Sequence, residues 1–246
     1  MKIEEYISSL PSSIISGQEV QLLDDSLRDI FRFADLGKND VFYHLGCGTG
    51  NSLGIAVKEF GARAVGIDND PDKIRQVEKN PNITTRCQDI TDSDLSDATV
   101  ILFWFSDDSI IAKMFAKFSD LKPGCKIITI FDPLPGTIPN RVSFPYLLHQ
   151  TPFTIAKNFK EQIVAVFETE CIDFTTAWEY AERYTKAIGS PDAGNDRFLT
   201  ILQTVTIWIN AKNHGVSCTK EIPAPVQAYI EILDNFFHIE VKHLIE

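Results

Sequence analysis

The sequence predicts an α/β fold: a parallel sheet with helices on both faces, closed by an antiparallel strand and followed by a C-terminal helical extension. Short apolar segments alternate with helical segments from residue 41 to 131. Beyond about residue 170 the apolar residues recur only at helical spacing. With 246 residues and a hydrophobic fraction of 44%, the chain suffices for one such domain and a smaller appendage. Continuous apolar strands separated by helices are typical of a sheet buried on both faces.

Each element follows from its apolar spacing and from the residues that end it. Helical spacing predicts a first helix over 19–35, and Gly37 follows its end. Pro71 suits the first turn of a later helix. Two further apolar stretches, 146–150 and 162–167, are expected to form a closing antiparallel pair, with 162–167 joining the sheet. The other expected elements are strands at 41–45, 64–68, 83–87, 99–104 and 126–131 and helices at 52–60, 71–79 and 109–118.

The C-terminal part of the chain reads as a separate unit of three helices. These are expected at about 173–188, 196–213 and 225–243, with breaks at Gly189-Ser190-Pro191 and from Gly215 to Pro223. Their apolar residues exceed what about 75 residues can hide among themselves. We therefore expect the extension to pack on the first domain or on a second subunit. The predicted domains are 1–168 and 169–246.

Cysteine usage favours a reducing compartment. The five cysteines are scattered, at positions 47, 87, 125, 171 and 218. Their number is odd and no two form a Cys-x-x-Cys pair, so neither a disulfide frame nor a zinc site is expected. The chain start, Met1-Lys2-Ile3-Glu4-Glu5, lacks the apolar core of a secretory signal. These features predict a cytoplasmic protein.

The remaining bulk properties exclude some classes of partner. No apolar run reaches about 18 residues, so no membrane span is expected. A formal net charge of −11 disfavours binding to nucleic acid and is compatible with a basic protein partner or with solubility alone. No metal site is expected, because the histidines beyond the first lack a common metal spacing, at positions 149, 214, 238 and 243.

The most informative motif follows the first expected strand. Val41–Leu45 leads into Gly46-Cys47-Gly48-Thr49-Gly50, and the second strand ends at Asp68. Glycines in such a turn allow a ligand to approach the backbone, and an acid at the end of the second strand can accept hydrogen bonds from ribose hydroxyls. The motif therefore predicts a Rossmann-like, nucleoside-binding domain.

The glycine spacing indicates which nucleoside is bound. Dinucleotide sites use Gly-x-Gly-x-x-Gly to open a helix N-terminus toward a pyrophosphate. Gly46-x-Gly48-x-Gly50 differs, and S-adenosylmethionine has no phosphate. Asp89, just past the third strand, either accepts a hydrogen bond from the adenine amino group or caps its own loop. The residues predicted to bind this cofactor are His44, Gly46, Cys47, Gly48, Gly50, Asp68, Asn69, Asp89 and Ile90.

The stretch from Glu19 to Gly136 resembles class I (seven-strand) S-adenosylmethionine-dependent methyltransferases, and most of all the small protein lysine methyltransferases of archaea and mitochondria. The resemblance rests on the segments 40–50, 60–71, 98–100, 121–124 and 133–136. It implies S-adenosylmethionine as cofactor and a protein side chain, lysine, as methyl acceptor. The departures from the family are His44 in place of an acid, Gly48-Thr49-Gly50-Asn51 in place of Gly-Asp-Gly-Arg, and Ile130-Phe131 in place of His-Asp.

His44 is the departure with the clearest physical consequence. The family's acid helps to hold the cofactor's ammonium group. A neutral histidine can accept one hydrogen bond from that group, whereas a protonated one would repel it. If its pKa is unperturbed, cofactor affinity should fall as the pH drops through about 6.5.

The segment after the fourth strand is expected to form the acceptor side of the site. Methyl transfer requires the acceptor nucleophile in line with the methyl–sulfur bond, and a lysine acceptor must arrive neutral. Phe105, Ser106 and Asp107 are the predicted catalytic residues. The Phe105 ring either walls a channel for a cationic amine or packs in the core. Asp107 either attracts a lysine or caps the following helix.

Three interpretations of function remain open from the sequence. The leading one is methyl transfer to a protein, with lysine as the acceptor. The second is methylation of a small molecule, with the C-terminal helices closing over the site as a lid. The third is a cofactor-binding protein without catalysis that works through its helical extension. The oligomeric state is open, and the extension is hypothesised to lie beside the open edge of the pocket.

Overall fold

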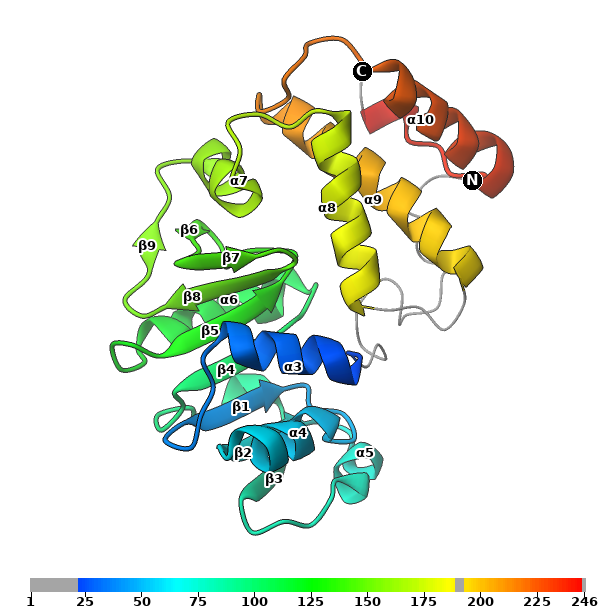
Figure 1. Ribbon diagram of the computed structural model, residues 1–246. Helices are drawn as coiled ribbons and strands as arrows, with labels where there is room; N and C mark the ends of the chain where they lie inside the picture. The colour runs from blue at the N-terminus through cyan, green and yellow to red at the C-terminus, as the bar shows by residue number, and fades with distance from the viewer. Residues whose placement is uncertain (1–21, 189–192, 245–246) are drawn as a thin grey trace.

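The computed structural model describes residues 22–188 and 193–244 and contains a seven-stranded sheet (Figure 1). The strand order is β3-β2-β1-β4-β5-β8-β7. The strands β1 to β5 pair in parallel, and β8 and β7 run antiparallel at one edge. The strands are β1 Val41–Leu45, β2 Arg63–Asp68, β3 Ile83–Cys87, β4 Val100–Phe103, β5 Lys126–Ile130, β7 Arg141–Ser143 and β8 Tyr146–Gln150, with β6 Thr137–Ile138 and β9 Thr154–Ile155 as a separate pair. The predicted fold class is confirmed.

Helices cover both faces of the sheet, with α3 and α4 on one face and α6 on the other (Figure 1). Alternate residues of β1 explain this arrangement. The Phe42 ring meets the Phe31 ring of α3 at 4.9 Å, whereas Leu45 packs in the cluster that contains Phe118 of α6. The helices are α3 Asp24–Phe33, α4 Asn51–Phe60, α5 Pro71–Gln76, α6 Asp108–Ser119, α7 Phe159–Phe167, α8 Phe174–Ile188, α9 Ala193–Asn213 and α10 Ala224–Phe237, with short 3-10 helices η1 Ile90–Asp92 and η2 Lys242–Leu244.

The expectation that residues 162–167 join the sheet is wrong. They form the C-terminal part of α7, which begins where the Asn158 side chain accepts a hydrogen bond from the backbone N–H of Glu161 at 2.9 Å. The closing strand is instead β8, which pairs with β5 from Lys126↔Gln150 to Ile130↔Tyr146. An apolar run of five residues, 163–167, is compatible with either a strand or a helix, and the N-cap decides between them here.

Several element boundaries differ from the expected ones. Helix α3 begins at Asp24, and residues 19–21 of the expected first helix lie outside the described part of the chain, as does the break at 189–191. Helix α10 ends at Phe237 rather than near 243, because His238 adopts a left-handed conformation with φ 56° and closes the helix.

The extension packs against the antiparallel edge of the sheet. One apolar cluster joins Phe144 and Leu147, around and in β8, to α7, α8, α9 and α10. The Phe144 ring lies 4.7 Å from the Tyr180 ring of α8. At its other end α8 reaches α3, where the Ser26 hydroxyl donates to the carbonyl of Ala187 at 2.6 Å (Figure 1). Helix α7 shares this cluster, so the boundary at 168/169 stays a proposal.

The expectation that the chain forms no disulfide is wrong. Cys171 and Cys218 are bonded; their Cα atoms lie 4.9 Å apart, and the two residues are 47 positions apart in sequence. Backbone hydrogen bonds hold the two segments together, because Ile172 N donates to Val216 O at 2.8 Å and Cys218 N donates to Ile172 O at 3.0 Å. Spacing along the chain does not reveal such a pair, since its proximity arises only in the fold. The cysteine argument for a reducing compartment therefore loses its premise.

Two further expectations concern membranes and metals. In residues 22–188 and 193–244, no helix is both long and apolar enough to cross a bilayer. Within the same ranges, no cluster of three or more histidine, cysteine or acidic side chains is arranged to hold a metal ion.

The disulfide predicts a specific pattern of thiol reactivity. Purified protein that is denatured without a reductant should take up iodoacetamide at Cys47, Cys87 and Cys125 but not at Cys171 or Cys218, because only the first three are free. Peptide mass spectrometry measures this, and the same protein denatured after reduction is the control. Alkylation of all five cysteines without reductant would contradict the bond.

Candidate functional site

A cavity of about 610 Å³ opens at the carboxyl ends of β1, β2 and β4. Its volume lies in the range of small-molecule sites, and its position is the switch point where ligands bind in open α/β sheets. All predicted site residues except Gly50 line it. The lining residues are Leu22, Leu27, His44, Leu45, Gly46, Cys47, Gly48, Thr49, Asn51, Ser52, Asp68, Asn69, Asp70, Lys73, Gln88, Asp89, Ile90, Leu102, Trp104, Phe105, Ser106, Asp107 and Ile110.

The glycine turn after β1 needs two of its glycines for steric reasons. Gly46 has φ 77°, and a Cβ there would lie 3.1 Å from the Phe105 ring. Gly50 has φ 81°, and a Cβ there would lie 2.7 Å from a methyl carbon of Val77. Both conformations are left-handed and favour glycine. Gly50 therefore shapes the start of α4 and does not border the cavity.

Asp68 ties the end of β2 to this turn. The backbone N–H of Gly48 donates to Asp68 Oδ2 at 2.8 Å, and that of Asp70 donates to Asp68 Oδ1 at 2.9 Å. An ionised carboxylate offers about four acceptor positions. The two backbone contacts hold the carboxylate at the cavity wall and leave capacity for two hydroxyl donors of a ligand.

His44 borders the cavity as a neutral imidazole. Desolvation by burial lowers its pKa to about 4, against the opposing effect of the Asp68 charge. Its Nδ1 lies 2.6 Å from the hydroxyl oxygen of Ser52, a buried residue of α4. The condition of an unperturbed pKa is not met, because burial moves the pKa of His44 well below 6.5.

Asp89 and Ile90 border the cavity beyond β3. The Oδ1 atom of Asp89 accepts hydrogen bonds from both the N–H and the hydroxyl of Thr91, each at 2.8 Å, and these contacts lower its pKa. Asp89 is thus the cap of η1, as the alternative interpretation supposed, and it also lines the cavity. The neighbouring Ile90 is buried and gives this end of the cavity an apolar surface.

The segment after β4 forms the opposite wall. The Phe105 ring stacks on the core residue Phe103 with the ring centroids 5.0 Å apart, and it also borders the cavity. Asp107 Oδ1 accepts a hydrogen bond from Ile110 N at 2.9 Å, so Asp107 caps α6 while facing the cavity. Trp104 and Ser106 complete this wall.

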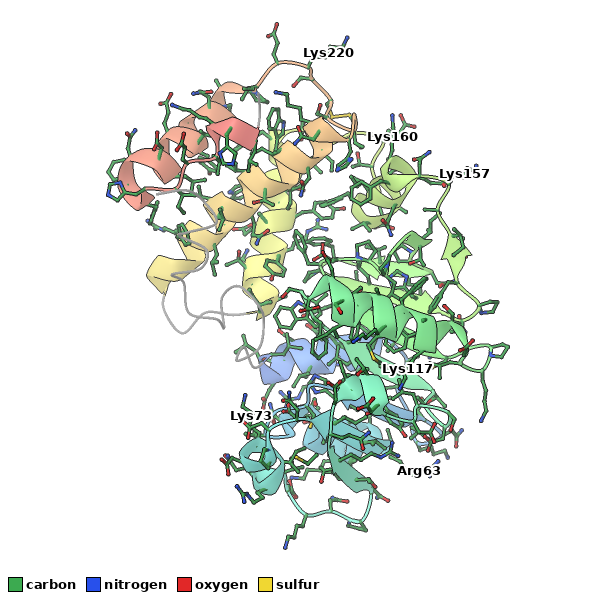
Figure 2. All side chains as sticks on the ribbon, turned by 180° about the vertical axis from the view of Figure 1, so that it is seen from behind. Arg63, Lys73, Lys117, Lys157, Lys160 and Lys220 are labelled. Carbon is green, nitrogen blue, oxygen red and sulfur yellow. A yellow bond between two sulfur atoms is a disulfide. The ribbon has the colours of Figure 1, made fainter. Side chains whose placement is uncertain are left out.

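Some lining residues were not identified from the sequence. Leu22 and Leu27 approach from the α3 side, where the helical spacing of apolar residues indicates burial but not the surface they contact. Lys73 lies on α5 (Figure 2), and no sequence signal distinguishes it from other surface lysines. Such residues become part of a site only through the packing of distant elements.

Known proteins resemble this chain in sequence and in structure. Residues 42–122 match the family model described as a methyltransferase domain. A protein-lysine N-methyltransferase of Saccharolobus islandicus (strain REY15A) is 29% identical over 113 residues, which cover 42% of this chain and 69% of the relative. The crystal structure of an RNA methyltransferase from Salinibacter ruber, in complex with S-adenosyl-L-homocysteine, is similar with a TM-score of 0.51 and 26% identity, covering 56% of this chain and 98% of that chain.

The fold and the site agree with these similarities. The sheet is parallel with an antiparallel edge, as the sequence predicted, and the cavity lies at the glycine turn and the acid of β2. The protein is therefore an S-adenosylmethionine-dependent methyltransferase, and residues 42–122 are the part that matches the methyltransferase domain.

Proposed function

We propose that this methyltransferase transfers the methyl group to a protein side chain and that the acceptor is lysine. The observation that supports this most is the composition of the wall after β4, where Trp104 and Phe105 are followed by Asp107. Aromatic faces and a carboxylate are the groups that attract a lysine side chain. The similarity to a protein-lysine N-methyltransferase supports the same acceptor.

The residues around the cavity fit the cofactor. Asp68 would hold the ribose hydroxyls, Asp89 the adenine amino group, and the glycine turn with neutral His44 the amino-acid end. At the start of α4, Asn51 Nδ2 donates to the Asp24 carboxylate at 2.7 Å. A negative charge at this helix start opposes a pyrophosphate, which favours a nucleoside without phosphate.

The chain's own residues would then act by positioning and by excluding water. Bound S-adenosylmethionine supplies a methyl group on a positively charged sulfur, which is already a good leaving group. Phe105 and Trp104 would hold the acceptor in line with that methyl, and an apolar channel lowers the pKa of an entering amine so that it can lose its proton. A strong general base is not required, which agrees with the lowered pKa of His44.

Other acceptors define the alternatives. A small molecule would need the C-terminal helices as a lid, and a non-catalytic protein would bind the cofactor without transfer. The relative from Salinibacter ruber acts on RNA, but a net charge of −11 disfavours a nucleic-acid acceptor.

For residues 169–246 we propose a role in selecting the acceptor, because the Tyr184 ring of α8 lies 4.9 Å from the Phe131 ring at the end of β5.

A labelling experiment tests the acceptor. The purified protein is incubated with S-adenosylmethionine carrying a tritiated methyl group and with cell lysate, and we expect labelled protein that yields methyl-lysine on hydrolysis. The control is the Gly46→Val variant, since even a Cβ at this position would lie 3.1 Å from Phe105. Label sensitive to ribonuclease, label in small molecules, or no label would each contradict the proposal.

The role of Asp68 predicts a loss of cofactor affinity. Asp68→Asn retains one acceptor oxygen for the turn but removes the charge, so S-adenosylmethionine should bind about tenfold more weakly, the scale of a hydrogen bond to a charged group. Calorimetry measures this. Asp92→Asn, on the exposed surface of η1, is the matched control and should bind as the wild type does. Tight binding of NAD to the wild type would overturn the choice of cofactor.

The pKa of His44 predicts a flat pH profile for cofactor binding. His44 is neutral above about pH 4, so affinity should not change between pH 8 and about pH 5.5. Stability should behave differently. The unfolded chain takes up a proton at this histidine near about 6.5, so the free energy of unfolding should fall as the pH drops from about 6.5 toward 4. An inflection of affinity near pH 6.5 that His44→Gln removes would contradict the assignment.

A further inference from the structure

Asp132 is the second residue after β5 and lies at the carboxyl ends of the strands, where the cavity wall after β4 also lies. Strands β4 and β5 are parallel neighbours, with Leu102 paired to Ile128, so their carboxyl ends emerge side by side. At Phe131 the backbone turns with φ 71°, and its N–H donates to the carbonyl of Pro145 at 2.7 Å. The carboxylate of Asp132 is thus placed beside the segment that forms the acceptor wall.

The surroundings of Asp132 contain aromatic rings and a second carboxylate. The Phe131 ring packs 4.9 Å from the Tyr184 ring. Asp132 is exposed at the surface but is closely surrounded by protein atoms, and this desolvation with the charge of Asp108 raises its pKa to about 6. Burial and the charge of Asp132 in turn raise the pKa of Tyr184 to about 12.

No lysine, arginine or histidine of residues 22–188 and 197–244 forms an ion pair with Asp132. Lys117 is on the same helix as Asp108, but it lies near the other end and its ammonium donates to the carbonyl of Ser93 at 2.7 Å (Figure 2). Nine residues along a helix correspond to about 14 Å. Lys113 is also on α6, and neither it nor Lys117 forms an ion pair with Asp132 or Asp108.

A buried network fixes the segment that follows Asp132. His149 Nε2 accepts a hydrogen bond from Leu134 N at 3.3 Å, and its Nδ1 lies 3.0 Å from the hydroxyl of Thr137. The Gln162 side chain donates to the carbonyls of Leu134 and Thr137 at 2.9 and 2.8 Å. Burial lowers the pKa of His149 to about 3, so the imidazole stays neutral and the hydrogen bonds around it do not change near neutral pH. The backbone that follows Asp132 is thus fixed before any acceptor arrives, which lowers the cost of ordering this segment on binding.

We propose that Asp132 is a specificity-determining residue that receives the ammonium group of a lysine acceptor beside the cavity wall that follows β4, near the rings of Phe131 and Tyr184. This inference rests on the proposed function and adds the residue that recognises the charge of the acceptor. A cation between two carboxylates relieves their mutual repulsion and gains two attractive contacts. The ammonium loses its proton to water before the amine reaches the methyl group, so Asp132 is not a general base.

The test measures binding of a cationic probe to the full-length protein loaded with S-adenosylhomocysteine. The probe is an octalysine peptide, and its dissociation constant is measured by calorimetry at pH 7.5. Asp132→Asn should weaken binding about fivefold, which is less than a fully buried charged contact would give because the site is partly solvated. Asp120→Asn, an exposed carboxylate at the end of α6, removes the same charge from the surface and should change binding by less than about twofold.

A pH series separates recognition from a purely structural role. Between pH 7.5 and 5.5 the wild type should lose about threefold in octalysine affinity as Asp132 takes up a proton, and Asp132→Asn should show no such change. Asp108 and Tyr184, the groups that face Asp132 from α6 and α8, are unaltered in both proteins. Asp132→Glu should restore most of the affinity.

The results that would contradict the role of Asp132 differ from those that would contradict the proposed function. The inference is overturned if octalysine does not bind, if Asp132→Asn binds as the wild type does, or if Asp120→Asn loses as much affinity. Calorimetry with S-adenosylmethionine runs in parallel on the same variants. Loss of cofactor binding by the wild type would instead contradict the proposed function, whereas intact cofactor binding with failed octalysine discrimination contradicts only the role of Asp132.

Discussion

The hydrogen bond from the Gly48 N–H to Asp68 is the contact on which the arrangement of the site depends. It joins the turn after β1 to the end of β2, while the N–H groups of Gly46 and Cys47 donate to the carbonyl of Ile67 at 2.8 and 3.0 Å. Strands β1 and β2 end side by side, with Leu45 paired to Ile67. The backbone of the glycine turn orients the Asp68 carboxylate, and that carboxylate in turn holds the glycine turn. The Asp68 carboxylate therefore has two roles, because it faces the ligand and also fixes the glycine turn.

Two regions at the carboxyl ends of the strands differ in chemistry. Around Asp68 the polar groups are engaged by backbone N–H groups, which favours a defined ligand of fixed shape. Around Asp132 two carboxylates lie close to aromatic rings, which favours a flexible cation. His44 lies toward the first region and is neutral, so it adds no positive charge that would compete with the cofactor's ammonium group.

The sequence predicted the five parallel strands and about half of the residues that line the cavity, because both follow local rules. Apolar runs define strands, and glycines and acids at strand ends define a nucleoside site. The predictions were wrong where contacts between residues far apart in the sequence determine the structure. Residues 162–167 are apolar in either conformation and became helical through the Asn158 cap. The Cys171–Cys218 bond requires α7, α8 and α9 to be placed first. The surroundings of Asp132 could not be predicted from the sequence, because Asp108 and Tyr184 lie on other elements, α6 and α8.

The contact between Ser26 and Ala187 has a consequence for how the two parts of the chain depend on each other. Helix α3 contributes Leu27 to the cavity, and the end of α8 holds α3 through this hydrogen bond. The C-terminal helices thus support a wall of the cofactor cavity although they do not line it. An acceptor that shifts α8 would shift that wall as well, so that occupancy by the acceptor and occupancy by the cofactor are thermodynamically linked and each alters the affinity for the other by the same factor.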